Sequence, residues 1–170
     1  MTFSWIGLGA NLGDPPAMFS SALRRLHSSE DMRVVTVSSA WNTPAWGMTD
    51  QPDFLNAVAC LDTALNAAEL LKRLLEVEDQ LGRRRDGAHW GPRTIDLDLL
   101  IHGEVMIDEP DLVVPHPRIS ERAFVLVPLH SVAPNLEVPG MGRVDELLAA
   151  LDDNDVCAVR VAGALTFQPD

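Results

Sequence analysis

The chain has 170 residues, 46% of them hydrophobic and 22% charged, which is the composition of a globular protein and excludes a disordered or fibrous one. Its formal net charge of −12 repels polyanions at long range, so we expect no nucleic-acid partner. The length suits one domain over residues 1–170, which we expect to be a monomer. The first residues lack the basic start of a signal peptide, and no segment has the length and apolarity of a membrane span, so we expect a cytoplasmic location.

The first third of the chain alternates apolar runs with one helical pattern. Residues 3–8 are short, apolar and aromatic, and predict a buried strand. Asp14-Pro15 predicts a helix start, because a carboxylate can cap the first turn and proline fits its first position. Residues 34–40 are rich in β-branched side chains and predict a second strand. The prolines and glycine within residues 43–53 predict a loop, and residues 54–61 predict a third strand.

The clearest predicted helix covers residues 65–81, where apolar side chains recur on one face and Gly82 follows as a stop signal. A polar loop over residues 83–92 leads into a fourth predicted strand at residues 94–101. Prolines divide the remainder, which carries short predicted helices at 123–130 and 144–151 and a tail without assignment after about residue 151. The order β-α-β-β-α-β predicts an α+β fold: a ferredoxin-like antiparallel sheet with helices packed on it and a proline-rich C-terminal extension. That architecture hosts many functions, so the function must be argued from sites.

Asp96 and Asp98 are the strongest candidate ligands of a metal ion. Side chains alternate along a strand, so these two carboxylates share one face while Ile95, Leu97 and Leu99 point the other way. Like charges this close repel unless a cation lies between them, and Mg²⁺ accepts one or two carboxylates together with water and phosphate oxygens. A bare Asp-x-Asp pair also fits a solvent-facing strand edge. The apolar neighbours favour the metal site, because unpaired buried carboxylates are costly.

The loop before this strand is rich in arginine, with Arg83, Arg84, Arg85 and Arg93 in one short stretch. Guanidinium groups bind phosphate oxygens through two parallel hydrogen bonds and stay charged, and Trp90 could stack on a flat ring. A solvated basic loop is the alternative. The carboxylate pair on the next strand favours a site for a metal-bound nucleotide.

Three further groups are weaker candidates. Glu78 lies near the apolar stripe of its helix and could reach a ligand or form an ion pair with an arginine. His116 stands between two prolines, with Arg118 and Arg122 close in sequence, although a lone histidine is more often structural. Phe54 and Asn56 share one strand face and would suit a flat heterocycle with hydrogen-bonding edges, or else belong to the core.

Four blocks of sequence follow one another in order: residues 7–13, Thr43-Pro44 with residues 51–57, residues 89–100, and residues 115–118 with 122–124. Together they resemble the 6-hydroxymethyl-7,8-dihydropterin pyrophosphokinase family of folate biosynthesis, from about Ile6 to Asn135. The block at 89–100 is highly specific. The glycine block alone is weak, since it matches neither a dinucleotide fingerprint nor a P-loop.

The resemblance implies an enzyme that transfers pyrophosphate from ATP, its co-substrate, to the hydroxymethyl oxygen of the pterin and releases AMP. It implies that Asp96 and Asp98 bind two Mg²⁺ ions and that the catalytic residues are Arg83, Arg93, Asp96 and Asp98. It implies an ATP site formed by Glu78, Arg83, Arg85, Trp90, Arg93, His116 and Arg122. It implies a pterin site formed by Thr43, Pro44, Ala45, Phe54, Asn56 and Phe124, with the ring between the two phenylalanines.

Three positions depart from the family pattern: Leu75 where an amide can contact the nucleotide, His89 in place of a more basic residue, and Trp46 in place of an aliphatic one. Two other functions share some of these features. RNA-recognition domains have the same strand order, but they need a basic surface and exposed sheet aromatics. A regulatory homologue without activity would not need the intact Asp-x-Asp pair and arginines.

Overall fold

A computed structural model describes residues 1–45, 50–82 and 94–167 of the chain. Its elements are β1 (Thr2–Ala10), α1 (Pro15–His27), β2 (Met32–Val37), β3 (Ala40–Thr43), β4 (Phe54–Thr63), α2 (Ala67–Gln80), β5 (Asp96–His102), β6 (Ile107–Glu109), β7 (Leu112–Val114), a 3₁₀ turn (Ile119–Glu121), α3 (Ala123–Val132), β8 (Glu137–Val138), β9 (Gly142–Arg143), α4 (Val144–Ala149), α5 (Asp153–Ala158) and β10 (Arg160–Gly163).

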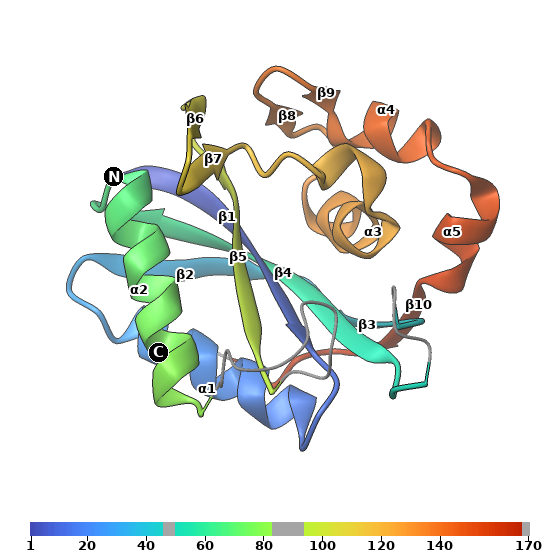
Figure 1. The fold of residues 1–170 in the computed structure, drawn as a ribbon, viewed down its shortest axis with the longest axis horizontal. Coiled ribbons are helices and arrows are strands. Elements are labelled where there is room, and N and C mark those ends of the chain that lie inside the picture. Colours follow the sequence, from blue (N-terminus) through green and yellow to red (C-terminus); the bar gives the residue numbers. More distant parts are fainter. Residues whose placement is uncertain (46–49, 83–93, 168–170) are drawn as a thin grey trace.

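One antiparallel sheet forms the centre of the molecule (Figure 1). Its strand order is β10-β3-β4-β1-β5, and β2 pairs with β4 beside β3. The long strand β4 is therefore paired along its whole length, by β1 on one side and by β2 and β3 on the other. The predicted antiparallel sheet with packed helices is confirmed.

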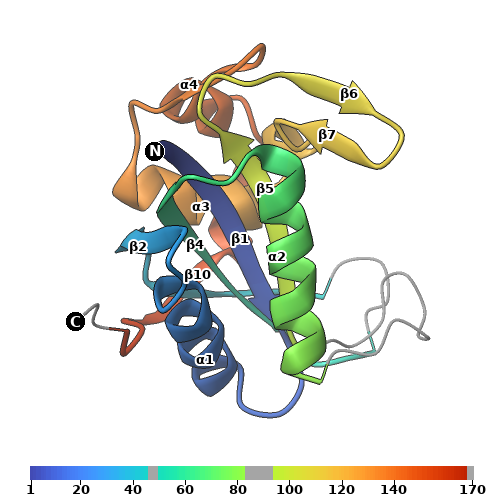
Figure 2. The same cartoon turned by 90° about the vertical axis from the view of Figure 1, so that its left-hand side faces the viewer.

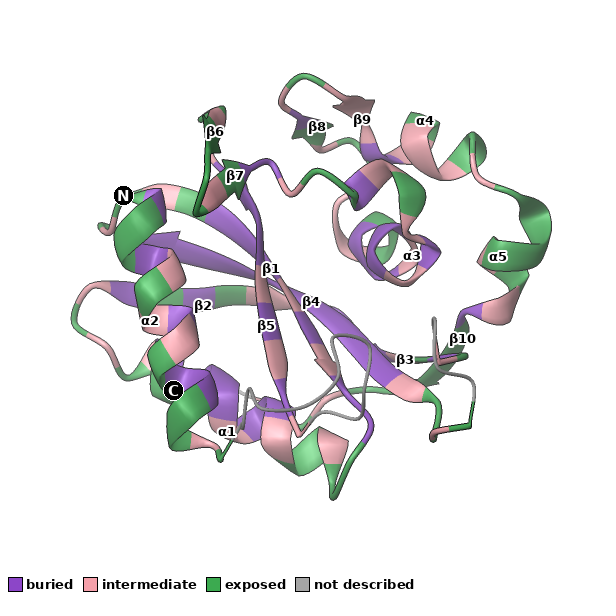
Figure 3. Ribbon diagram, viewed as in Figure 1, coloured by how far each residue is buried: buried purple, intermediate pink, exposed green. Residues whose placement is uncertain are grey.

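Helices cover both faces of this sheet (Figures 1 and 2). On one face α1 and α2 pack against alternate strand residues such as Leu8, Leu61 and Leu97. On the other face α3 and α4 pack against Val58 and Leu100, among others. Figure 3 shows the buried positions concentrated along the strands and the inner sides of the helices. Because side chains alternate along each strand, residues on the two faces of the sheet belong to two separate hydrophobic clusters.

The predicted single strand over residues 34–40 is wrong: the segment forms β2 and β3, with Ser38 and Ser39 between them. The Ser38 side chain causes the break, because its hydroxyl oxygen accepts the N–H of Val58 at 3.0 Å, where a backbone carbonyl would continue the ladder. The Ser38 N–H still donates to the Val58 carbonyl at 2.9 Å. Thr43, predicted to begin the following loop, is instead the last residue of β3.

The helix signals in the sequence are confirmed by their caps. Asp14 accepts the N–H of Ala17 at the start of α1. Asn66 and Glu69 form a reciprocal capping box at the start of α2, in which each side chain accepts the other residue's backbone N–H. Gly82 has a φ of 84° after the last turn of α2, a conformation that glycine adopts at little cost.

The remainder after β5 holds two small hairpins, β6-β7 and β8-β9, and three helices. The tail, for which the sequence predicted no structure, forms α5 and then β10, which pairs with β3 at the far edge of the central sheet (Figure 1). In the described part of the chain, no helix has the length and apolarity needed to cross a membrane.

Candidate active site

The candidate residues meet at one end of the central sheet. Strand register places Asp96 of β5 opposite Gly9 of β1, Gly9 opposite Asn56 of β4, and Asn56 opposite Trp41 of β3. Residues opposite one another in an antiparallel sheet point to the same face. The row therefore joins the predicted metal ligand and the predicted pterin contact across β1, with a glycine between them.

The alternation predicted for β5 is confirmed. Leu97 and Leu99 are buried in the cluster beneath α1 and α2, whereas Asp96 and Asp98 are half-exposed on the opposite face. The next row of the sheet pairs Asp98 with Gly7. The two carboxylates thus border a surface of β1 that carries no side chains, which leaves room for a ligand above it.

Arg122 faces the carboxylate pair from the residue just before α3. Its Nη1 lies 3.8 Å from Oδ2 of Asp98, and its guanidinium carbon lies 5.5 Å from the centre of the Phe124 ring. Burial lowers the pKa of Arg122, and Asp98 counteracts this effect. Within the described residues, the buried Nε of Arg122 has no hydrogen-bond partner. A buried cation with an unused donor is suited to a phosphate oxygen.

His116 is held at the same end of the sheet by its own backbone. Its N–H donates to the carbonyl of Leu100 at 2.8 Å, and its ring Nδ1 accepts the N–H of Arg118 at 3.1 Å. Burial and the neighbouring Arg122 and Arg118 lower the pKa of His116 to about 4. The ring is therefore neutral near pH 7 with its proton on Nε2, which makes it a hydrogen-bond donor to an anionic ligand.

This gives a pH prediction for the ligand-free protein. The pKa of His116 lies below its ordinary value of 6.5, so the unfolded chain binds the proton more readily. Its contribution to stability is present above pH 6.5 and is lost as the pH falls toward 4. We expect His116→Asn, whose side-chain oxygen can still accept the Arg118 N–H, to lose less stability than wild type over this range in urea unfolding. Titration of the His116 ring by NMR near pH 6.5 would contradict the prediction.

Glu78 of α2 anchors β5 from its open edge. The side chain is 1% exposed, and its Oε1 accepts the N–H of Leu97, between the two aspartates, at 2.6 Å. Glu78 also lines a cavity of about 240 Å³ that Asp96, Asp98 and His116 share. Leu75 lies on the same cavity wall, so the departure from the family pattern noted there adds an apolar group to this space.

The predicted pterin residues lie on the other side of β1. The side-chain amide of Asn56 donates to Oγ1 of Thr43 at 2.8 Å, and both residues are buried. Phe54 lies opposite Thr43 in the sheet, and its side chain points to the same face of β4 as that of Asn56, as predicted. Phe124, in the first turn of α3, packs with the cluster on this face. Pro44 and Ala45 follow directly on β3.

Sequence reasoning missed two contributors. Gly7 and Gly9 lie on one face of β1 and form the bare surface between the two halves of the site. The predicted strand ended at residue 8, so Gly9 was not expected to share a strand face with Gly7. Asn11, which is 6% exposed, donates from Nδ2 to Oε1 of Gln51 and to the carbonyl of Pro52. These hydrogen bonds connect the end of β1 to the segment before β4. No local sequence pattern predicts this contact.

A methyl group at Gly9 would test this surface. An added Cβ there would lie 3.2 Å from Oδ1 of Asn56, closer than ordinary packing, and would push the amide away from Thr43. We expect Gly9→Ala to raise the KM for the pterin about tenfold, the scale of a sub-ångström misplacement. At Gly7 an added Cβ meets carbons no closer than 3.7 Å, so Gly7→Ala is the matched control and leaves the Asn56 amide in place. Equal pterin KM values in both variants would contradict the assignment.

Several predicted residues lie outside the described part of the chain: Arg83, Arg85, Trp90 and Arg93, together with the departures His89 and Trp46. The ATP-binding and catalytic roles given to the three arginines and to Trp90 remain predictions.

Comparison with known proteins decides the family. The sequence model of 7,8-dihydro-6-hydroxymethylpterin-pyrophosphokinase (HPPK) matches residues 5–134. The chain belongs to the HPPK family. Among its relatives, the 2-amino-4-hydroxy-6-hydroxymethyldihydropteridine pyrophosphokinases of Methylorubrum extorquens and Pseudomonas aeruginosa are each 44% identical to it. These alignments cover 92% of this chain and 98% of the first relative, and 86% of this chain and 90% of the second.

The predicted resemblance is thus confirmed, and with it the activity. The protein is a transferase of folate biosynthesis that moves pyrophosphate from ATP to the hydroxymethyl group of the pterin and releases AMP. The fold agrees: a solved structure of Plasmodium falciparum HPPK-DHPS with pteroate aligns with a TM-score of 0.67 at 12% identity. That alignment covers 87% of this chain but 42% of the Plasmodium chain, so this protein spans less than half of that longer one.

Proposed function

We propose that the protein works with Mg²⁺ held by Asp96 and Asp98, and that ATP and the pterin meet above the bare surface of β1. The donor set supports this. Two carboxylates on one strand face suit an ion that completes its shell with water and phosphate oxygens. Among the residues that the structure describes, no three acidic, histidine or cysteine side chains lie close enough together to hold a metal ion with protein ligands alone. A site with only two carboxylates fits Mg²⁺ ions that arrive bound to ATP. The family resemblance implies two such ions.

The proposed ATP site lies around β5. The buried guanidinium of Arg122 and the neutral ring of His116 would donate hydrogen bonds to phosphate oxygens, and Glu78 holds the strand that carries the aspartates. Arg83, Arg85, Trp90 and Arg93 would complete the site, with Arg83 and Arg93 on the transferred group. Bound Mg²⁺ would supply neutralisation of the phosphate charge that otherwise repels the attacking oxygen. Pyrophosphoryl transfer needs this neutralisation and in-line placement more than it needs a strong base.

The proposed pterin site lies around β4 and β3. Asn56 would bind the hydrogen-bonding edge of the pterin, with its amide oriented by Thr43, and the ring would lie between Phe54 and Phe124. Pro44 and Ala45 would border it. The register supports this placement, because Asn56 and Asp96 flank Gly9 in one row. The hydroxymethyl oxygen would then approach the phosphates across β1.

The topology supports a finer description of the fold. Strands β2, β4, β1 and β5 lie side by side in that order, with α1 after β1 and α2 after β4. This order supports a ferredoxin-like sheet, to which β3, β10 and the proline-rich segment after β5 are additions. We also propose one catalytic domain over residues 1–170, a monomer without a nucleic-acid partner. Both cysteines are free thiols, which fits the proposed cytoplasmic location.

The row of Asp96, Gly9 and Asn56 carries the proposal. It brings a carboxylate that can bind a metal ion and an amide that can hydrogen-bond a heterocycle to the two sides of one bare surface. The test is a coupled assay for AMP with ATP and Mg²⁺, with and without the hydroxymethyl pterin. We expect AMP only when all three are present, and no turnover when EDTA removes the metal. Pterin-independent AMP formation, or full activity in EDTA, would overturn it. Failure to bind an ATP analogue with Mg²⁺ would favour the regulatory homologue without activity.

A further inference from the structure

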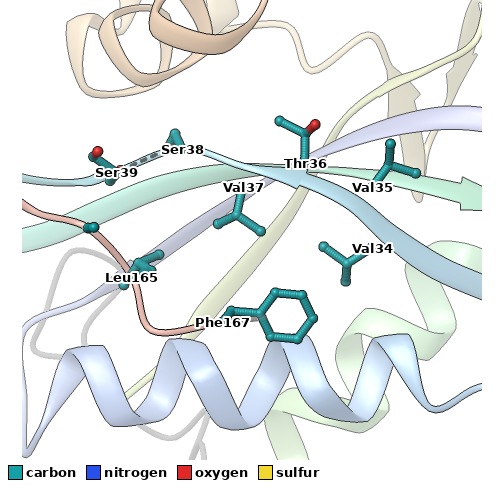
Figure 4. A pocket seen from close by; sticks show the side chains of 9 residues that line it. Val34, Val35, Thr36, Val37, Ser38, Ser39, Leu165 and Phe167 are labelled. Carbon is teal, nitrogen blue, oxygen red and sulfur yellow. Dashed lines mark hydrogen bonds between the residues drawn. The ribbon is translucent and has the colours of Figure 1, made fainter. Parts of the chain in front are cut away.

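The last described segment of the chain runs along the edge of the sheet that carries the pterin side of the site. β10 pairs with β3 at Arg160 with Asn42, Val161 with Trp41 and Gly163 with Ala40. Residues 164–167 then continue beside β2, and a cavity of about 180 Å³ lies between them and that strand (Figure 4). We call residues 160–167 the C-terminal strap. The strap lies beyond the 5–134 match to the family.

Apolar side chains fix the far end of the strap. Leu165 and Phe167 pack against the hydrophobic cluster beneath α1 and α2. Figure 4 shows both residues on the side of β2 to which Val34 and Val37 point, above α1. The Phe167 ring meets the His27 ring edge-on, with centres 5.8 Å apart and planes at 68°. His27 in turn accepts the N–H of Val34 through Nδ1 at 3.1 Å, so the strap, α1 and β2 are joined at one point.

The near end of the strap supports a weak strand. β3 has four residues, and three of them pair with β4: Trp41, Asn42 and Thr43. Without β10 it would be an edge strand, and a short edge strand frays readily. Yet β3 carries Thr43, whose hydroxyl accepts the Asn56 amide, and it leads directly into Pro44 and Ala45. The position of β3 therefore sets the position of much of the proposed pterin site.

We propose that the C-terminal strap positions β3 for the acceptor substrate, with Phe167 as its anchor and Thr43 and Asn56 as the groups it holds in place. The inference rests on the proposed pterin site. The strap acts on the pterin alone, because those residues proposed for ATP that the structure describes lie on α2, β5 and the segment before α3, across β1 and β4 from β3. Leu165 and Phe167 are the strap residues that pack against the hydrophobic cluster, and both also line the cavity, so we expect the loss of the Phe167 ring to loosen the strap.

The test compares Phe167→Ala with Leu148→Ala, which removes a partly buried side chain of α4 from the other cluster. Amide hydrogen exchange at residues 41–43 reports on β3, thermal unfolding reports on stability, and steady-state kinetics give KM for each substrate. We expect Phe167→Ala to speed exchange at residues 41–43 and raise the pterin KM about tenfold, with the ATP KM within about twofold. Leu148→Ala should lower the unfolding temperature while leaving exchange at β3 and both KM values near wild type. Phe167→Leu should restore most of the pterin KM.

A second variant, a chain ending at Val159, removes the strap outright and should match or exceed the effect of Phe167→Ala. The inference is overturned if β3 exchange and pterin KM stay at wild-type values in either strap variant. It is also overturned if both KM values rise together, or if Leu148→Ala raises the pterin KM equally, since these are the marks of general destabilisation. Failure of the wild-type protein to form AMP from ATP and pterin would instead overturn the proposed function.

Discussion

Alanine at Asp96 or at Asp98 is expected to lower kcat for AMP formation by about a thousandfold, the loss seen when a main electrostatic stabiliser of a transition state is removed. The two carboxylates share one face of β5 at the candidate site. One carboxylate alone would hold the ions poorly, and the charge on the transferred phosphates would go unneutralised. The measurement is the AMP assay at saturating substrates, with Mg²⁺ titrated for each variant.

The two substitutions should differ in stability. Asp98 lies 3.8 Å from the guanidinium of Arg122 and does more than Asp96 to keep the pKa of that buried cation high. Asp98→Ala therefore leaves the buried positive charge of Arg122 less well neutralised. We expect the Asp98→Ala variant to unfold at a lower temperature than Asp96→Ala. Asp108→Ala, on the exposed hairpin strand β6, is the control for loss of an acidic residue. Normal turnover in both site variants would show that these carboxylates do not hold the metal.

Glu78→Ala is expected to have the largest effect on stability and a large one on activity. It leaves the Leu97 N–H without its buried acceptor, which costs about 1–3 kcal/mol, and it opens a cavity beneath β5. Because Leu97 lies between the two aspartates, both carboxylates should shift when the strand edge loosens. Urea unfolding measures the first effect, and Mg²⁺-dependent kcat measures the second.

Glu78→Gln separates this anchoring role from a direct role in ATP binding. Its amide oxygen can still accept the Leu97 N–H, so we expect stability within about 1 kcal/mol of wild type, as for an exchange that keeps a hydrogen bond. If the charge of Glu78 matters to ATP, the ATP KM of this variant changes while its stability does not. Equal destabilisation by Gln and Ala would show that the Leu97 contact is not what Glu78 provides.

Glu78 also illustrates how far sequence could lead. Helical spacing placed it near the apolar stripe of α2, and the family resemblance assigned it to ATP. Neither could show that its carboxylate pairs with the outer edge of β5, because that depends on how α2 lies against the sheet. The same holds for Ser38, where one hydroxyl in the ladder divides a segment whose composition predicts one continuous strand.

The sequence by itself determined the features that depend on near neighbours in the chain. Asp96 and Asp98 share a face because side chains alternate along any strand, and α1 and α2 begin and end where their caps stand. Only the tertiary structure decided which strands meet. The row that joins Asp96, Gly9, Asn56 and Trp41 comes from strand register, and β10 reaches β3 from a tail with no local pattern of its own. Register and pairing arise from burying two sheet faces at once, a property of the whole chain that no short window of sequence contains.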